Sequence, residues 1–530
     1  MSKRQRQALQ GAEHAFPSPV GPVSKEQLAR WPQMLATDLL VDSDLCRRLA
    51  MMLSLAPLMV YSDYTGVGAE IEAFRLLIPA LREFGGLNVD DSAVIFSRVC
   101  DVRHNQLRLL QAMSAECAHC QGMCVFDDLM DHLVPAAATL ANGMVPTHPT
   151  RQDMASHLQW LLDNRAWAFD PKHKVDCLHH LKPCFVHPLM EHCQSQMFLG
   201  DSGKVRPFVV NVSGVTCDGW TTMGKQGRYG HASEECHNVF VAETKARADQ
   251  ALDDLRIVEC TANYPWKEKL REPLRDTHFV VAIKANPFSL GYPVQRDRMF
   301  CACLNLQTTR WVGPMEPDDV QANFDAVFAK ECAISGDVFF VVPSEERANH
   351  DVAMANGQGN YPSPEQVQAF TDQEALDLCL PQYNRSCGEK YGALRDERQS
   401  LSGVFLCDLE QNPDERALCG AVWPTLLTKS NIACFTRDDR VQFALPIEHM
   451  GAQGMHVVSC PQFGISVSPM RKHIERFSPR VIKEFAGRGM HLGALSAWML
   501  FVLGNTMRIR FEYPCPPLTS MPDDECEDEV

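Results

Sequence analysis

The sequence predicts an α/β fold with a second, smaller domain. An apolar strand at 58–61 is followed by a glycine-rich turn and then by a helix with Ile71 and Phe74 at helical spacing. The same order of strand and helix returns at 93–110. Repeated strand and helix units predict a sheet covered by helices. The length of 530 residues leaves room for two or three domains.

Composition limits the class of protein. Hydrophobic residues make up 45% and charged residues 22% of the chain, as in ordinary globular proteins. The net charge of -16 argues against a general nucleic-acid binder, because neutralising phosphates needs Lys and Arg. Part of this charge lies in an acidic tail, 516–530, which we expect to be solvated and disordered.

The cysteines and the apolar runs point to a cellular location. The 22 cysteines lack a regular spacing and no apolar leader precedes them, so we expect mostly free thiols in a reducing compartment. The longest apolar run, 492–507, is too short and too interrupted to cross a membrane. The basic residues at 3–6 suggest a nuclear address, with the cytoplasm as the alternative. Residues 1–45 are rich in proline and predict a loosely ordered lead-in.

The turn after the first strand is a candidate cofactor loop. Glycines between a strand and a helix let the backbone approach a ligand, and the N-terminus of the helix offers free N–H groups. A tight turn without a ligand is the alternative. The candidate residues are Tyr64, Thr65, Gly66, Val67 and Gly68.

Two acidic residues follow the next two strands. Asp101 stands where an acidic side chain accepts hydrogen bonds from ribose hydroxyls in nucleotide-binding sheets, and a helix N-cap is its competing role. Asp128 lies in a third such unit, 124–129, and is expected to face the adenine of a cofactor.

An insertion at about 135–206 is dense in His and Cys. Zinc needs four N or S ligands, and the spacing of Cys117 and Cys120 just before the insertion suits half of such a site. No regular second pair follows. We therefore expect no metal and interpret the region as an insertion with solvated His and buried Cys, with a structural zinc as the alternative.

The central candidate is Cys217, in a glycine-rich turn after a strand at 208–212. A thiol at the carboxyl edge of a buried strand is held rigidly and still meets a substrate. An ordinary buried cysteine is the alternative. Glu259 ends another strand and becomes a candidate proton donor. Arg296 and Arg298, two positions apart, point to one side of a strand and need an anion or carboxylate there.

The order of these motifs resembles the DNA (cytosine-5) methyltransferase family. The motifs are YTGVGA, GVTCDGWTTMGKQG, VEC and GYPVQRDRMF, in that order. The resemblance covers roughly 58–303 and returns at Gly487, where GRGMHL is similar to the final motif of the family; Gly504 begins an alternative match. The sequence departs from the family pattern at Thr216, Asp218 and Arg488.

This resemblance implies a fold, a cofactor and a substrate. The fold is a Rossmann-like methyltransferase sheet at 46–304, with a target-recognition domain at 305–425 and a return to the catalytic domain at 426–515. The cofactor is S-adenosylmethionine, held by the loop residues, Asp101, Asp128 and Gly487. The substrate is cytosine in DNA, flipped out of the duplex. Cytosine in RNA, or a binding protein without activity, are the alternatives.

The resemblance also implies a mechanism. The Cys217 thiolate would add to C6 of cytosine, while Glu259 hydrogen-bonds or protonates N3. Arg296 and Arg298 would orient the base and steady the glutamate and the active-site loop. The methyl group would then pass to C5.

Overall fold

The protein is described by a computed structural model. The structure describes residues 19–116, 120, 122–186, 198–200, 203–215, 219–220, 227–398, 403–416, 419–436, 441–457 and 466–509.

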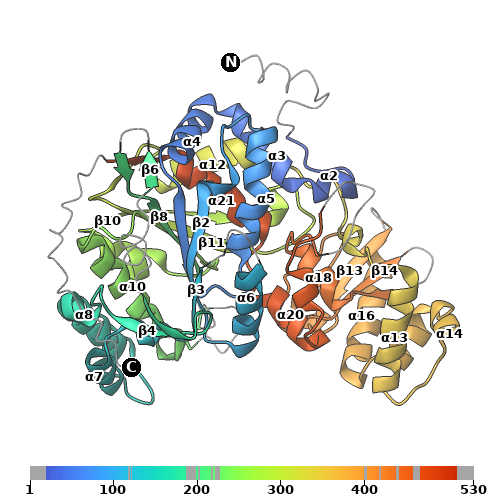
Figure 1. Cartoon of the computed structure of the whole chain (residues 1–530). Coiled ribbons are helices and arrows are strands. Elements are labelled where there is room, and N and C mark those ends of the chain that lie inside the picture. The colour runs from blue at the N-terminus through green and yellow to red at the C-terminus, as the bar shows by residue number, and fades with distance from the viewer. Residues whose placement is uncertain are drawn as a thin grey trace, which may run out of the picture.

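A seven-stranded sheet forms the centre of the larger lobe (Figure 1). Its strand order is β10-β11-β9-β8-β1-β2-β3. All neighbours pair in parallel except β11, which is antiparallel to both β9 and β10. The predicted α/β class is therefore confirmed. The strands are β1 (Leu58–Asp63), β2 (Val94–Cys100), β3 (Cys124–Phe126), β8 (Phe208–Gly214), β9 (Leu255–Thr261), β10 (His278–Ala285) and β11 (Arg298–Asn305).

Side chains alternate between the two faces of this sheet, as the pleat requires. In β1, Leu58 and Val60 join the core that contains α5 (Ala69–Glu83) and α21 (Leu492–Gly504). On the other face, Val258 of β9 packs in a core with α10 (Ser233–Asp249). Both faces are covered, which explains why the strands are buried along almost their whole length.

The described part of the N-terminal segment is helical. Residues 19–45 include α2 (Lys25–Ala29), α3 (Trp31–Asp38) and a 3₁₀ helix, and α4 (Ser43–Leu55) follows. Trp31 and Leu35 are fully buried in the core shared with α21. The expectation of a loosely ordered lead-in over 1–45 therefore needs correction for this part, because these apolar side chains cover the sheet's helices.

A smaller lobe follows α12 (Pro317–Phe328), which itself packs on β10. Helices α13, α15 and α16 pack on one face of an antiparallel three-stranded sheet and share a core with it that includes Tyr391 and Phe405. This lobe lies beside the larger one in Figure 1. It begins after 328 and its sheet ends at Phe443, so its bounds differ from the expected 305–425. Its elements are α13 (Ser344–Gly357), α14 (Pro364–Gln368), α15 (Asp372–Cys379), α16 (Gln382–Arg398), β13 (Val404–Asp408), β14 (Ile432–Thr436) and β15 (Val441–Phe443).

Two further groups of elements matter for the site. After the smaller lobe, α18 (Pro446–Ala452) packs on α20 (Pro479–Arg488), which returns the chain to the sheet. The insertion after β3 contains α7 (Pro135–Met144), α8 (Arg151–Ala168), β4 (Lys174–Cys177), β5 (Lys182–Phe185), β6 (Phe198–Gly200) and β7 (Gly203–Val205). Helix α6 (His104–Glu116) joins β2 to β3. Among the described residues, no helix is long and apolar enough to span a membrane.

Candidate active site at the carboxyl edge of the sheet

The predicted cofactor loop lies between β1 and α5. Tyr64, Gly66 and Gly68 all have positive φ angles, of 57°, 61° and 75°. Gly68 is the N-cap of α5, so free N–H groups of the helix face this loop. A Cβ atom added at Gly66 would meet nothing within 4 Å. The loop therefore leaves open space directly beside its backbone, which is what a ligand that approaches the chain needs.

Asp101 ties this loop to the end of β2. Its Oδ2 accepts a hydrogen bond from the Gly66 N–H at 2.8 Å, and its Oδ1 accepts one from the Arg103 N–H at 2.9 Å. Burial raises the pKa of Asp101, and these N–H donors oppose that rise. The carboxylate thus fixes the loop and also begins the turn into α6. Each oxygen keeps a second lone pair for a ligand.

Asp128 lies at the end of β3. Its Oδ1 accepts a hydrogen bond from the Met130 N–H at 2.9 Å and caps the 3₁₀ helix Leu129–His132. At the start of α10, burial raises the pKa of Glu235, and the negative charge of Asp128 raises it further. The structure therefore places Asp128 at the same edge of the sheet as Asp101, since β2 and β3 run parallel.

One buried hydroxyl group belongs to this loop. The Tyr64 ring packs edge-on against Phe240, with ring centroids 6.0 Å apart. Tyr64 Oη is buried and has no hydrogen-bond partner among the described residues. Buried polar atoms are normally paired. Together with the open space at Gly66, this atom fits a site that is completed by a polar ligand.

Glu259 and Arg298 form an ion pair on neighbouring strands. Arg298 Nε lies 2.8 Å from Glu259 Oε1, and both side chains are largely shielded from solvent. Glu259 is in register with Gly214 of β8, the strand that leads to Cys217. The structure thus brings the predicted glutamate and one of the two predicted arginines together at the carboxyl edge.

Arg296 has a different environment from Arg298. Its guanidinium donates hydrogen bonds to the carbonyls of Gly489 at 2.7 Å, Gly487 at 3.2 Å and Leu426 at 3.3 Å. Arg296 precedes β11, so the alternation of a strand does not set its direction. The structure places this side chain against the returning C-terminal segment rather than along the strand beside Arg298.

The C-terminal segment closes the site from one side. A Cβ at Gly487 would lie 2.4 Å from the Leu427 carbonyl carbon, so only glycine fits there. A Cβ at Gly489 would come within 3.7 Å of Val67 in the cofactor loop. Arg488 Nε lies 3.2 Å from Glu484 Oε1. The positive charge of Arg488 also lowers the pKa of Asp101, against the rise that burial causes.

Four predicted parts of the site meet at Gly214. A Cβ on this glycine would lie 3.6 Å from the Tyr64 carbonyl oxygen and 3.7 Å from Met490 Cγ. Its register partner is Glu259. The cofactor loop, the strand before Cys217, the glutamate and the segment after Gly487 are therefore neighbours.

Cys217, Thr216 and Asp218 lie outside the described residues. The residues on either side of this gap make defined contacts. Val215 is buried at the end of β8. The Gly219 carbonyl accepts a hydrogen bond from the Arg228 N–H at 3.0 Å, and Trp220 Nε1 donates to Glu234 Oε1 at 2.8 Å.

Sequence reasoning missed Glu70, which lies in the first turn of α5. Glu70 is fully buried, and burial raises its pKa to about 8. No described cation forms an ion pair with it. A glutamate two residues after Gly68 is visible in the sequence, but the helical spacing of Ile71 and Phe74 does not indicate that this glutamate also faces inward.

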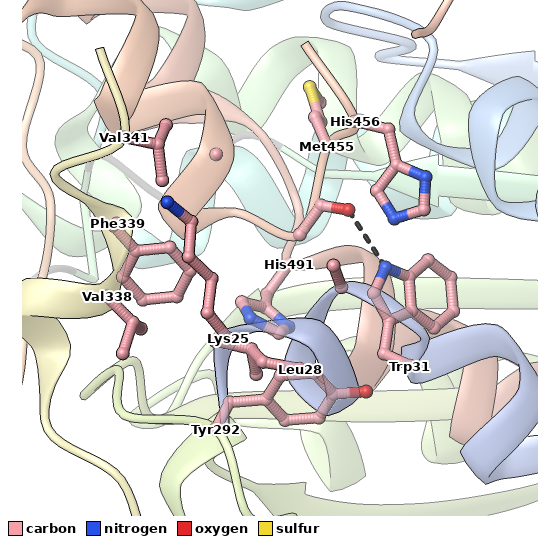
Figure 2. A pocket seen from close by; sticks show the side chains of 13 residues that line it. Lys25, Leu28, Trp31, Tyr292, Val338, Phe339, Val341, Met455, His456 and His491 are labelled. Carbon is pink, nitrogen blue, oxygen red and sulfur yellow. Dashed lines mark hydrogen bonds between the residues drawn. The ribbon is translucent and has the colours of Figure 1, made fainter. Parts of the chain in front are cut away.

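A separate cavity of about 80 Å³ lies between the N-terminal helices and the C-terminal segment (Figure 2). Its walls are mostly apolar and include Leu28, Phe339 and Met455. Trp31 Nε1 donates a hydrogen bond to the Gly454 carbonyl at 3.0 Å across this junction. Of the predicted site residues that the structure describes, none lines this cavity, so it is distinct from the described part of the candidate active site.

No protein-family model matches the chain, and no curated protein matches its sequence. Among solved structures, the chain is similar to a variant of DNMT2 from Spodoptera frugiperda, with 10% identity, 84% of this chain and 99% of that chain covered, and a TM-score of 0.38. It is also similar to the S. pombe Dnmt2 methyltransferase, with 10% identity, 84% and 98% covered, and a TM-score of 0.37. The Entamoeba histolytica methyltransferase EhMeth shows 7% identity, the same two coverages of 84% and 98%, and a TM-score of 0.37.

The order and direction of the strands in the central sheet define the fold. Six of the seven strands run in one direction, and β11 is reversed between β9 and β10. The glycine loop, Asp101 and Asp128 follow the first three strands at the carboxyl edge. By its sheet topology, the chain has a Rossmann-like methyltransferase fold.

Proposed function

We propose that the protein is an S-adenosylmethionine-dependent methyltransferase that acts on C5 of cytosine in DNA. The observation that carries this proposal is the Glu259–Arg298 ion pair beside Gly214, three residues before Cys217 in the sequence. A carboxyl group, a guanidinium and a thiol on adjacent strand ends are the groups that nucleophilic catalysis on a pyrimidine ring requires.

The cofactor would lie along the loop after β1. Gly66 offers space at the backbone, Asp101 and Asp128 offer carboxylate oxygens, and Tyr64 Oη is a buried hydroxyl in need of a partner. When bound there, S-adenosylmethionine would supply the methyl group for C5. The proximity of Gly489 and Met490 to this loop would shield the transfer from water.

The covalent step belongs to Cys217 and Glu259. The Cys217 thiolate forms a bond to C6 of cytosine, and the electron pair of the C5–C6 double bond makes C5 nucleophilic. Glu259 hydrogen-bonds or protonates N3, where negative charge develops. After methylation, the C5 proton passes to water and the electron pair of the C5–H bond restores the C5–C6 double bond. The C6–S bond breaks, and the thiolate departs with the electron pair of that bond.

Arg298 positions Glu259 for this role. Its Nε lies 2.8 Å from one carboxylate oxygen, which restricts the rotation of the glutamate and leaves the other oxygen for the base. Arg296 fixes the C-terminal segment by hydrogen bonds to carbonyls, and this segment borders both Gly214 and the cofactor loop. We propose that Arg296 acts through that segment rather than on the base.

A trapping assay tests the proposal. The purified protein would be incubated with S-adenosylmethionine and duplex DNA that contains 5-fluorocytosine, and then run on a denaturing gel. We expect a shifted band that needs the cofactor, is lost in Cys217→Ala and is kept in the control Cys332→Ala, a half-buried cysteine elsewhere. An adduct that forms only with 5-fluorocytosine in RNA would move the proposal to RNA.

The second candidate is a binding protein that has the fold without the activity. The departures at Asp218 and Arg488 favour it, because Arg488 brings a cation close to Asp101 in the cofactor region. Calorimetric titration with S-adenosylmethionine separates the two candidates. Cofactor binding without an adduct on either nucleic acid would support the second one and contradict the first.

A further inference from the structure

Four ligand-type side chains meet at the outer edge of the central sheet. Cys124 begins β3, Cys177 ends β4, His180 lies in the turn of the hairpin, and Cys184 lies in β5. The three cysteines are buried and the histidine is half-buried. Their three Sγ atoms and the ring nitrogen all lie within 4.8 Å of one another.

The distances match the edges of a tetrahedron around one metal ion. His180 Nδ1 lies 3.6 Å from Cys124 Sγ, 3.4 Å from Cys177 Sγ and 3.5 Å from Cys184 Sγ. Zinc bonds of about 2.3 Å to sulfur and about 2.0 Å to nitrogen place such atoms about 3.5 Å apart at the tetrahedral angle. A single ring nitrogen at nearly equal distances from three sulfurs is the arrangement that one shared metal ion produces.

The surroundings also suit a thiolate. The Val125 N–H donates to Cys177 Sγ at 3.4 Å, and the His180 N–H donates to it at 3.5 Å. Metal ligands of this type bind as thiolates, so donors aimed at sulfur are expected around them.

We propose that Cys124, Cys177, His180 and Cys184 bind one structural zinc ion. All four positions of a tetrahedral zinc are filled by protein, which is typical of a structural rather than a catalytic site. Soft thiolates with one imidazole select zinc over hard cations such as magnesium. This proposal takes up the structural zinc that the sequence left as the alternative, in place of the expectation of no metal. Its ligands are not the predicted pair, because Cys117 lies outside the described residues and Cys120 is not in the cluster.

A second group of potential ligands, Asp63, His132 and Glu243, has a different character. Arg98 approaches Asp63 at 2.6 Å and Glu243 at 3.7 Å, so a cation already compensates these carboxylates. A divalent ion there would face the guanidinium directly.

The zinc would attach the β4–β5 hairpin to the edge strand of the sheet. β3 has only the residues Cys124–Phe126, and it pairs with β2 alone in the sheet. Apart from the cluster, the Leu178 N–H donates to the Val125 carbonyl at 2.9 Å. A short edge strand gains little from pairing on one side. The metal would therefore fix β3 and, with it, the position of Asp128 directly after the strand.

Metal analysis of the full-length protein tests this proposal directly. Protein purified without chelators should contain about one zinc per chain by mass spectrometry. X-ray absorption at the zinc edge should show three sulfur neighbours and one nitrogen. Zinc-free protein, or protein with a disulfide between two of the three cysteines, would overturn the proposal. Neither measurement depends on methyl transfer, so failure of the proposed function would leave this result unaffected.

Substitutions locate the zinc on these ligands. Cys184→Ala and His180→Ala should lose at least nine-tenths of the zinc and melt at lower temperature, whereas His180→Cys should keep it, because four thiolates also bind zinc. The control Cys434→Ala removes a buried cysteine of the smaller lobe and should keep the metal. If the alanine variants do not fold, the zinc content of the wild type and of His180→Cys tests the proposal, and both should contain the metal. Retention of zinc by a folded Cys184→Ala would place the ion elsewhere.

Discussion

The two faces of the central sheet are buried equally but by opposite means. On one face, all thirteen residues of α21 are buried and none is charged. On the other face, the buried residues of α10 include Glu243, Lys245 and Arg247. Burial alone therefore does not determine composition. A face can hold charges when each has a partner of the opposite sign.

The charges on the α10 face form one network. Asp253 lies 2.6 Å from Arg247 and 2.9 Å from Arg256, and the Tyr61 hydroxyl also donates to it. Arg98 lies 2.6 Å from Asp63. These arginines hold the pKa of Asp253 below its ordinary value, although desolvation acts in the opposite direction and is the largest single effect.

Glu70 shows what happens on the apolar face. Desolvation also dominates its pKa, but no described cation forms an ion pair with it, so the pKa rises to about 8. Two fully buried carboxyl groups of one protein thus shift in opposite directions. The difference comes from neighbouring cations, and the following predictions test it from the largest effect to the smallest.

The largest effect is expected for Asp253→Asn, which leaves Arg247 and Arg256 buried without their carboxylate. We expect the free energy of unfolding to fall by about 3–5 kcal/mol at pH 7. Because the folded pKa of Asp253 is lowered, its contribution is present above the unfolded pKa and is lost as the pH falls through the folded value. Urea unfolding of both proteins at pH 7 and pH 2.5 measures this loss. If the wild type keeps the same stability advantage over the variant at pH 2.5 as at pH 7, the charge explanation is wrong.

A substitution that creates a cavity on the α21 face should lower the stability of the protein by an amount that does not depend on pH. Leu495 is fully buried, and Leu495→Ala should lower the free energy of unfolding by about 2–4 kcal/mol. No charge is removed, so the loss should be the same at pH 5 and pH 8. Urea titrations at both values check it, and a loss that changes with pH would show that the apolar face is coupled to titrating groups.

Glu70→Gln should make the protein more stable at high pH. The folded pKa of about 8 lies above the unfolded one, so wild-type stability is full below the unfolded pKa and falls as the pH rises towards 8. Glutamine does not titrate and should remove roughly 2 kcal/mol of this fall between pH 5 and pH 8. The unfolding free energy of both proteins at the two pH values gives the answer. Parallel pH profiles would show that Glu70 has a cation or another compensating partner.

The smallest effect concerns the cofactor loop. Gly66→Ala places a Cβ in the open space beside a backbone with φ of 61° and should weaken S-adenosylmethionine binding at least tenfold, or about 1.4 kcal/mol. Gly359→Ala is the matched control, because Gly359 also has a positive φ, of 83°, and open space around it. Calorimetry measures both affinities. Equal affinities in the two variants would mean that the space at Gly66 is not the cofactor site.

The sequence allowed the edge of the sheet to be predicted, but not every side chain on it. Glu259 and Arg298 lie in strands, where alternation and strand ends set their direction, and they meet at 2.8 Å. Arg296 lies outside the strand, so its direction depends on the carbonyls of Gly487 and Gly489, nearly two hundred residues later. Local periodicity carries no information about such a contact.

The cluster of Cys124, Cys177, His180 and Cys184 shows the same limit. Three of its members are close in sequence, but the fourth comes from β3, and only the hairpin contact with that strand completes the set. The regular spacing of paired cysteines favours Cys117 and Cys120 instead. A spacing rule finds ligands that share one loop and misses those that two separate elements bring together.

The sequence by itself determined the α/β class and the places where glycines, carboxylates and Cys217 follow strands, because hydrophobic period and turn chemistry are local properties. The tertiary structure decided which of these groups share an environment. It paired Glu259 with Arg298, turned Arg296 towards the C-terminal segment, and gave Asp253 cations that Glu70 lacks. Those outcomes depend on distances between distant segments, and electrostatic energies and metal geometry change over a few ångströms.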